Sequence, residues 1–150
     1  MRILRSVVLV VLGVVLAGVG GAGACECVIR DDGGRLIARI EKNGVFRDAS
    51  GRRIGIFEKS GGAVRSGSGG LIGRIDENGV IRDGSGRRLG VVDDSGILRD
   101  ASGRLTGRID GGVALRNRAG RVVGRLDGWD ADCFGPVAAY LWFFDPRHHW

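Results

Sequence analysis

The chain has very little proline and histidine, and the little histidine it has lies at one end. Its 150 residues contain 2 Pro and 2 His but 29 Gly. Abundant glycine without proline or a Gly-X-Y period argues against a collagen-like chain and indicates many tight turns. Both histidines, His148 and His149, lie directly before Trp150 and outside the repeats. The body of the fold therefore has no histidine for a Ser-His-Asp triad.

Motifs for cofactors and metals are also missing. The sequence has no P-loop and no paired catalytic carboxylates. The two adjacent histidines are not spaced to put two ligands on one face. Its Asp-containing turns lack the Gly-Gly-x-Gly-x-Asp pattern of calcium-binding β-rolls. We therefore predict a protein that is not an enzyme and has no cofactor and no metal site.

The N-terminal segment, residues 1–24, has the features of a signal peptide. Arg2 and Arg5 precede an apolar run from Val7 to Leu16, which is shorter than the roughly 20 residues of a membrane span. A small-residue cleavage site, Ala22-Gly23-Ala24, follows. The sequence thus predicts export to the periplasm or the extracellular space, with residues 25–150 forming one mature domain.

The cleavage site allows a second interpretation. Ala22-Gly23-Ala24-Cys25 is similar to a lipoprotein signal, in which Cys25 would be lipidated and would anchor the protein to a membrane. Such signals usually carry Leu where this sequence has Ala22. The sequence leaves both types of cleavage open.

The net charge of the whole chain is +6, and loss of Arg2 and Arg5 with the signal peptide leaves +4. An excess of positive charge favours anionic partners such as nucleic acid or envelope phosphates. Most copies of the repeat described next also contain an Arg-Asp pair, as in Arg82-Asp83. Repetition of such pairs indicates cross-strand pairing on a surface rather than a site.

A repeat of about 17 residues accounts for most of the mature chain. Equivalent arginines are separated by 17, 18, 17, 17 and 17 residues, which gives six copies with one extra residue near Gly61-Gly62. These arginines, here called the column arginines, are Arg30, Arg47, Arg65, Arg82, Arg99 and Arg116. The best-defined copy has turn chemistry at Asn78-Gly79 and at Gly84-Ser85-Gly86, so each copy predicts two short antiparallel strands.

Two positions of the repeat are apolar in every copy, and we expect them to face the core. The first comprises Ile29, Phe46, Val64, Ile81, Leu98 and Leu115; the second comprises Ile40, Phe57, Ile75, Val92, Ile109 and Leu126. The residue before the second position varies between Arg and Ile or Val, which indicates an exposed or half-exposed position. We call it the variable column: Arg39, Ile56, Arg74, Val91, Arg108 and Arg125. A small residue precedes it in each copy and favours close approach of neighbouring backbones.

A single hairpin cannot bury its own apolar face, so the copies must pack on one another. Closure around an axis removes the open edges that a linear stack would leave. After Asp127 the repeat stops, and the apolar stretch from Pro136 to Phe144 is interpreted as a strand buried in the core. The predicted fold class is all-β: short hairpin repeats closed around a pseudo-symmetry axis, with a C-terminal core strand.

The repeat and the tail together resemble the bacterial four-fold and five-fold β-flower families. The motifs are Gly79-Val80-Ile81-Arg82-Asp83, Leu89-Gly90-Val91-Val92 and the tail Ala138-Ala139-Tyr140-Leu141-Trp142-Phe143-Phe144. The resemblance covers about residues 28–144 and implies hairpin petals around an axis, without known catalytic residues. Six copies depart from the number in either family name.

A second resemblance is to the tyrosine-aspartate repeats of toxin shells. It rests on Asp100-Ala101-Ser102-Gly103-Arg104-Leu105-Thr106-Gly107. Those repeats carry Tyr before the Asp, where this chain has Arg99. Six copies are also too few to enclose a cargo.

Export makes a disulfide plausible, and two of the three cysteines flank the repeats. Cys27 precedes the first copy and Cys133 follows the last. In a closed ring these points are neighbours, so we predict a Cys27–Cys133 disulfide that joins the ends. Cys25 is then the odd cysteine, which favours its lipidation.

For function, the sequence predicts an exported structural or interaction module of the cell envelope. One alternative is a protein that binds anionic polymers, such as envelope phosphates, nucleic acid or acidic glycans. Another is a fragment-like relative of the tyrosine-aspartate repeat toxin shells. A ring would bring the turn arginines to one rim, except in the third copy, where Gly70 takes the place of Arg. The binding candidates are Arg52, Arg53, Arg87, Arg88, Arg104 and Arg121.

Overall fold

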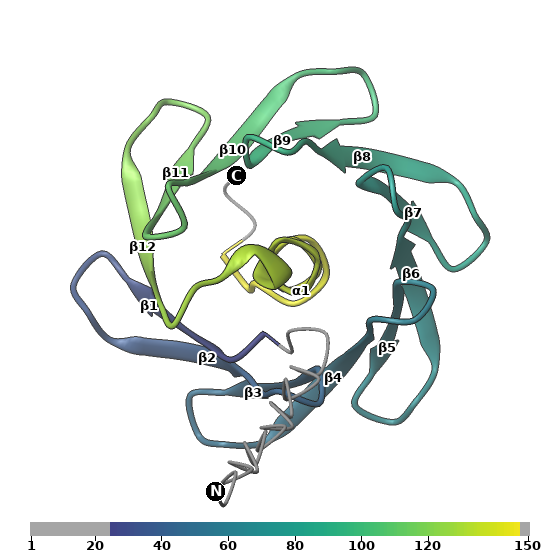
Figure 1. Ribbon diagram of the computed structural model, residues 1–150, viewed down its shortest axis with the longest axis horizontal. Helices are drawn as coiled ribbons and strands as arrows, with labels where there is room; N and C mark the ends of the chain where they lie inside the picture. Colours follow the sequence, from purple (N-terminus) through teal and green to yellow (C-terminus); the bar gives the residue numbers. More distant parts are fainter. Residues whose placement is uncertain (1–24, 148–150) are drawn as a thin grey trace, which may run out of the picture.

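A computed structural model describes residues 25–147, and the predicted signal peptide and the terminal histidines lie outside this part. Twelve antiparallel strands form a closed barrel (Figure 1). Their bounds are β1 Cys27–Asp31, β2 Leu36–Ile40, β3 Val45–Asp48, β4 Arg53–Glu58, β5 Ala63–Ser66, β6 Leu71–Ile75, β7 Val80–Asp83, β8 Arg88–Val92, β9 Ile97–Asp100, β10 Leu105–Asp110, β11 Ala114–Asn117 and β12 Val122–Asp127.

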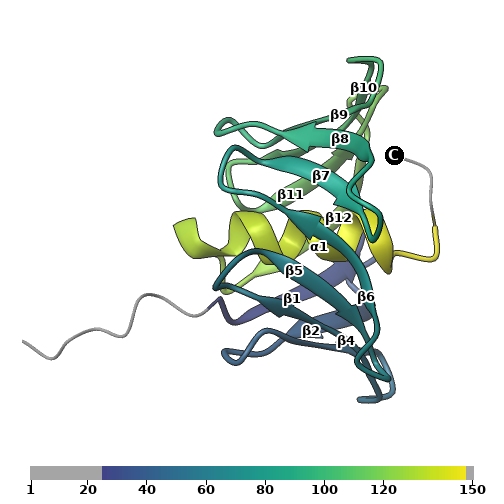
Figure 2. The same cartoon turned by 90° about the vertical axis from the view of Figure 1, so that its right-hand side faces the viewer.

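Each copy of the repeat forms one hairpin, called a petal here, so β1–β2 is petal 1 and β11–β12 is petal 6. Because neighbours in sequence pair all the way round, the turns alternate between the two ends of the ring (Figure 2). The turns within petals form the tip rim: 31–35, 48–52, 66–70, 83–87, 100–104 and 117–121. The turns between petals, together with the end of β12, form the acidic rim: 41–45, 58–62, 76–80, 93–97, 110–113 and 127–128.

The ring closes between the first strand and the last. Val28 of β1 lies opposite Asp127 of β12, and Ile29 lies opposite Leu126. Residues at the same positions of the repeat pair in the same way between other neighbouring petals, for example Ile109 with Leu115. The all-β class, the six copies and the closure around an axis are therefore confirmed.

The two apolar positions face the interior, as predicted. All twelve side chains are buried, from Ile29 at 0% exposed to Phe57 at 8%. Residues of the variable column lie on the outer wall, where Arg39 is exposed and Val91 half-buried. The alternation of strand side chains between two faces explains both results.

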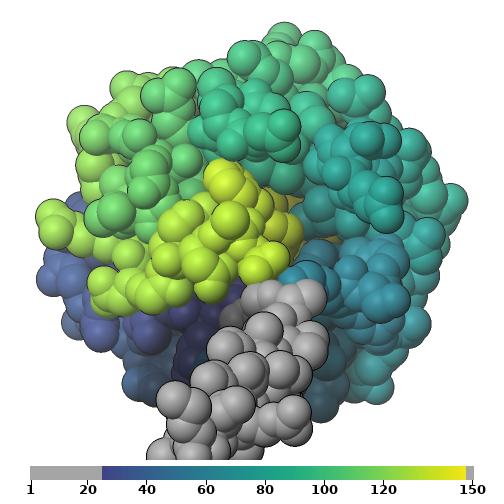
Figure 3. Space-filling view, viewed as in Figure 1, coloured from purple at the N-terminus to yellow at the C-terminus, as the bar shows by residue number. Residues whose placement is uncertain are grey.

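The tail is a helix, so the prediction of a core strand is wrong. A short 3₁₀ helix, η1 (Ala131–Cys133), leads into α1 (Phe134–Phe143), which runs along the axis of the ring (Figures 1 and 2). Figure 3 shows this segment filling the centre of one face. Because the ring surrounds α1, the helix is apolar on all sides and its sequence lacks the polar stripe that would have revealed it.

The small-residue position of the repeat makes room for the end of this helix. A Cβ on Gly55 would overlap the ring of Phe144, one on Gly73 the ring of Phe143, and one on Gly90 the ring of Trp142. The same hypothetical Cβ atoms would crowd backbone carbonyl oxygens of the next petal. Close approach between neighbouring petals is thus confirmed, and the space for aromatic rings is an addition to it.

The chain after α1 is held by an ion pair between a buried aspartate and a half-buried arginine. Asp145 is 0% exposed, and its carboxylate accepts hydrogen bonds from Arg147 Nη2 at 2.7 Å and Nε at 2.9 Å. Arg147 Nη1 also donates to the Val123 carbonyl of β12 at 2.6 Å. This contact fixes the C-terminal end of the helix to the tip side of the wall.

The disulfide joins Cys25, not Cys27, to Cys133, so the predicted pairing is wrong. The Cα atoms of Cys25 and Cys133 are 4.8 Å apart, and Cys27 is a buried free cysteine. Cys27 is the first residue of β1 and its side chain is held in the core, whereas Cys25 precedes the strand and reaches the loop before α1. A disulfide sulfur has no free valence for a thioether, so this bond and lipidation of Cys25 exclude one another in the same molecule.

None of the helices within residues 25–147 is long and apolar enough to cross a membrane.

Candidate anion-binding site

The turns of the tip rim are ordered by a side chain at their first residue. In petal 4, Asp83 Oδ1 accepts hydrogen bonds from the Ser85 amide, the Ser85 hydroxyl and the Arg87 amide at 2.7–3.0 Å. Gly86 completes the turn with φ of 89°. The turn therefore holds the backbone of Arg87 still while its side chain stays exposed to solvent.

The Ser hydroxyls lower the pKa of the tip aspartates. The main cause is the hydrogen bond from Ser50 to Asp48, from Ser85 to Asp83 and from Ser102 to Asp100, followed by contacts from the turn backbone. Their carboxylates are thus committed to the turns as anions. The Asp after a column arginine belongs to the turn, so of each Arg-Asp pair only the arginine takes part in the predicted cross-strand pairing.

The column arginines find their acidic partners in the preceding petal instead. Arg116 Nε lies 2.7 Å from Asp110 Oδ2, and its Nη1 donates to the Gly120 carbonyl of its own tip at 2.8 Å. The corresponding ion pairs are Arg30–Asp127, Arg47–Glu41, Arg65–Glu58 and Arg82–Asp76. These five column arginines therefore span the outer wall from the acidic rim to the tip rim.

The six arginines predicted as binding candidates are all exposed on or beside the tip rim. They come from petals 2, 4, 5 and 6, so they share one end of the ring but are distributed around it and do not form a single cluster. Petal 3 has an uncharged tip, Ser66 to Gly70. Sequence reasoning missed Arg35 and Arg118, which lie at the tips of petals 1 and 6 and could have been found from the register of the repeat.

The opposite end of the ring carries the opposite charge. Its turns contain Glu41, Glu58, Asp76, Glu77, Asp93, Asp94, Asp110 and Asp127. Both lysines of the chain, Lys42 and Lys59, are also there, and Asp130 and Asp132 lie just before α1. The N-terminus of α1 faces this rim, an orientation that the helix dipole favours. The charges of the mature chain are thus separated along the axis of the ring.

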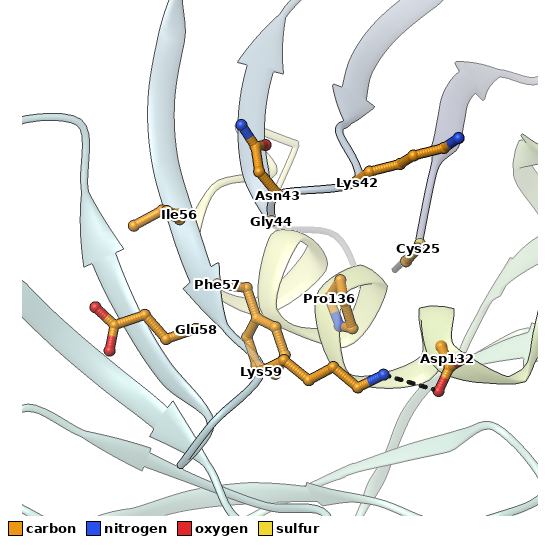
Figure 4. Close-up of a pocket in the computed structure, with 10 residues that line it drawn as sticks. All are labelled: Cys25, Lys42, Asn43, Gly44, Ile56, Phe57, Glu58, Lys59, Asp132 and Pro136. Atoms are coloured by element: carbon orange, nitrogen blue, oxygen red, sulfur yellow. Dashed lines mark hydrogen bonds and ion pairs between the residues drawn. The ribbon is translucent and has the colours of Figure 1, made fainter. Parts of the chain in front are cut away.

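A small hollow of about 170 Å³ lies on the acidic rim between the first two petals and α1 (Figure 4). Its lining includes Phe57, Pro136 and the ion pair between Lys59 Nζ and Asp132 Oδ1 at 3.2 Å. Binding pockets for small molecules usually measure about 300–1,000 Å³. Within this lining, Lys59 and Asp132 are paired with each other and Cys25 is in a disulfide.

Within the part of the chain that the structure describes, no three His, Cys, Asp or Glu side chains are grouped as they would be to hold a metal. The tip rim, with its exposed guanidinium groups on fixed backbones, is the candidate site. Its chemistry suits anions, because guanidinium groups bind phosphate and carboxylate through paired hydrogen bonds.

No protein-family model, no curated protein and no solved structure matches this chain.

Proposed function

We propose that the protein is an exported module of the cell envelope that binds an anionic polymer through the arginines of its tip rim. The observation that carries this proposal is the separation of charge between the two ends of the ring. The tip turns also contain five aspartates, but with Arg53 and Arg88 beside them the arginines are in excess, and an excess of positive charge attracts polyanions. The relation to the β-flower families remains part of the proposal and rests on the motifs quoted above.

Two features support export. The N-terminal sequence has the pattern of a signal peptide, and the Cys25–Cys133 disulfide suits an oxidising compartment. Fractionation of the native host tests this part. We expect a mature chain that begins at or near Cys25 outside the cytosol; an intact cytosolic chain that keeps residues 1–24 would contradict export.

Retention on phosphocellulose tests anion binding. The protein should be retained at low salt and released steeply as salt rises, because binding to a polyanion displaces counterions. The double variant Arg52→Gln/Arg87→Gln should elute at clearly lower salt than the parent.

The matched control removes two positive charges from the other end. Lys42→Gln/Lys59→Gln changes the net charge by the same amount but leaves the tip rim intact, so its elution should stay close to that of the parent. Equal shifts for both double variants would mean that only net charge matters. No retention at low salt, or retention that salt does not alter, would end the proposal.

A further inference from the structure

Arginines oppose one another across the seams between petals on the outer wall. At four seams the variable-column arginine lies directly opposite the column arginine of the next petal. These pairs are Arg39 with Arg47, Arg74 with Arg82, Arg108 with Arg116 and Arg125 with Arg30. Like charges directly opposite one another on a sheet face are destabilising, so the pairs do not serve to hold the ring together.

The two members of each pair differ in what they contact. Arg30 is anchored: its Nε donates to Asp127 at 2.8 Å and its Nη1 to the Gly34 carbonyl at 3.2 Å. Arg125 beside it is exposed and has no hydrogen bond or acidic partner within residues 25–147. The same holds for Arg39 and Arg108. Each pair therefore combines an ordered guanidinium group with one that is available to a ligand.

Three of the four pairs are neighbours around the ring. They occupy the seams β10–β11, β12–β1 and β2–β3, which follow one another along one side of the wall (Figure 1). We call these six residues the arginine strip: Arg30, Arg39, Arg47, Arg108, Arg116 and Arg125. With strands spaced about 4.8 Å apart, adjacent seams are roughly 10 Å apart. The fourth pair, Arg74 with Arg82, is isolated, because its neighbouring seams carry Ile56 and Val91.

We propose that the arginine strip binds a linear polyol-phosphate polymer of the cell envelope, laid across the strands so that successive seams contact phosphates. This rests on the proposed binding of an anionic polymer, and it adds the outer wall to the tip rim as a contact surface and names the ligand. Phosphate suits the pairs because two neighbouring guanidinium groups donate several hydrogen bonds to one anion. Every aromatic side chain described belongs to the core or packs against it, which leaves the wall without rings for stacking bases. The strip is therefore suited to phosphates of a polymer without bases.

The matched variants Arg125→Ala and Arg74→Ala test the strip. Arg125 lies between Ala114 and Arg30, and Arg74 lies between Ala63 and Arg82, so their local surroundings are alike. With poly(glycerol phosphate) as the probe at low salt, Arg125→Ala should raise the Kd roughly three- to ten-fold, as expected for one exposed charged contact. Arg74→Ala should change it less than about two-fold, within the effect of an isolated exposed charge. Neither variant should lower the melting temperature, because each removes a like-charge contact.

Other outcomes separate the strip from the tip rim. Equal losses for Arg74→Ala and Arg125→Ala would overturn the strip as a continuous site. If Arg52→Gln/Arg87→Gln abolishes binding while Arg125→Ala leaves it intact, the strip fails and the proposed function stands. If the protein binds neither poly(glycerol phosphate) nor phosphocellulose, both the strip and the proposed function are overturned. Tighter binding of a single-stranded oligonucleotide with the same number of phosphates would overturn the choice of polymer.

Discussion

The hydrogen bonds of the column arginines on the outer wall repeat from petal to petal, whereas the contacts of the interior glycines with the C-terminal helix do not. On the wall, all six column arginines donate through Nη1 to the glycine carbonyl of their own tip at 2.8–3.2 Å. Inside, equivalent glycines meet different rings, as Gly55 meets Phe144 and Gly90 meets Trp142. A six-fold shell surrounds a single helix that cannot share its symmetry.

The difference shows where the information for each part resides. Local turn chemistry and alternating apolar residues are enough to specify the shell six times over. The interior depends on one segment that occurs once, so its loss cannot be compensated by the repeats. Variants that act on the helix, on the wall and on the contacts between them test this division.

Removal of residues 138–150 should have the largest effect. It deletes most of α1 together with the Asp145–Arg147 ion pair, and leaves an empty ring lined with apolar side chains. We expect loss of cooperative unfolding, monitored by circular dichroism during heating. A truncated protein that stays soluble and melts cooperatively would show that the shell is stable without its filling.

Aspartate substitutions on the two faces of one petal should differ greatly. Ile81 is 0% exposed, so Ile81→Asp buries a carboxylate and should cost more than about 4 kcal/mol. Val91 is half-buried on the wall opposite Arg99, so Val91→Asp should change the stability by less than about 1 kcal/mol. Urea unfolding measures both. Similar losses would mean that the faces of the strand do not differ as described.

Substitution of Cys25 should lower the stability more than substitution of Cys27. Cys25→Ser removes a bond that joins residues 108 apart in sequence, and the chain-entropy estimate for such a loop is at most roughly 4–5 kcal/mol. Cys27→Ser places a hydroxyl in a buried site and should cost roughly 1–2 kcal/mol. Thermal unfolding without reductant compares the two.

Mass spectrometry after alkylation checks the pairing itself. Burial raises the pKa of the Cys27 thiol to about 12, so alkylation at neutral pH should label this residue only after unfolding. A free Cys133 thiol, or a lipid on Cys25, would contradict the disulfide described above.

Glycines of the interior and of the tips should respond differently to alanine. Gly90→Ala would push a Cβ into the Trp142 ring and should cost about 1–3 kcal/mol. Gly84→Ala lies in a tip turn where petals 2 and 5 carry Ala49 and Ala101, so it should be neutral or slightly stabilising. Equal melting temperatures for the two variants would mean that the rings do not pack closely on the wall.

Acidification should have the smallest effect on stability, and it should act only at the tips that contain a titrating aspartate. The pKa values of Asp48, Asp83 and Asp100 are lowered in the folded protein, so the stabilisation they provide is present above their unfolded pKa of about 3.9 and is lost as the pH falls through the folded value. Petal 6 has Asn117 at this place, and an amide does not titrate there. In an NMR titration the Arg87 amide resonance should shift on acidification and that of Arg121 should not. Equal shifts would contradict this account of the tips.

The sequence was sufficient to predict the repeated shell but not the single segment at its centre. The period of the repeat was enough to predict the strands, the buried positions and the closure of the ring. It was not enough for the tail, because a helix enclosed by apolar walls has no polar face and a short apolar run fits a strand as well. Cys25 and Cys27 are two residues apart, so only the start of β1 at Cys27 decides which of them reaches Cys133.

The candidate site was predictable in part. The tip arginines could be found because a closed ring of hairpins must gather equivalent turns at one end. The arginine strip could not, since it depends on which residue lies opposite which across a seam. Arg125 and Arg30 are far apart in sequence and become neighbours only when the ring is closed.

Closure between β1 and β12 also determines when the chain no longer has unpaired strand edges to which other chains could add. Every other pairing in the ring joins strands that are neighbours in sequence, but the contact between Arg30 and Asp127 spans 97 residues. Until β12 has been synthesised and has paired with β1, β1 and the newest strand are unprotected edges. Another copy of the protein carries the same repeat and fits either edge. The time between the first petal and the last is therefore the period in which this protein is most prone to aggregate.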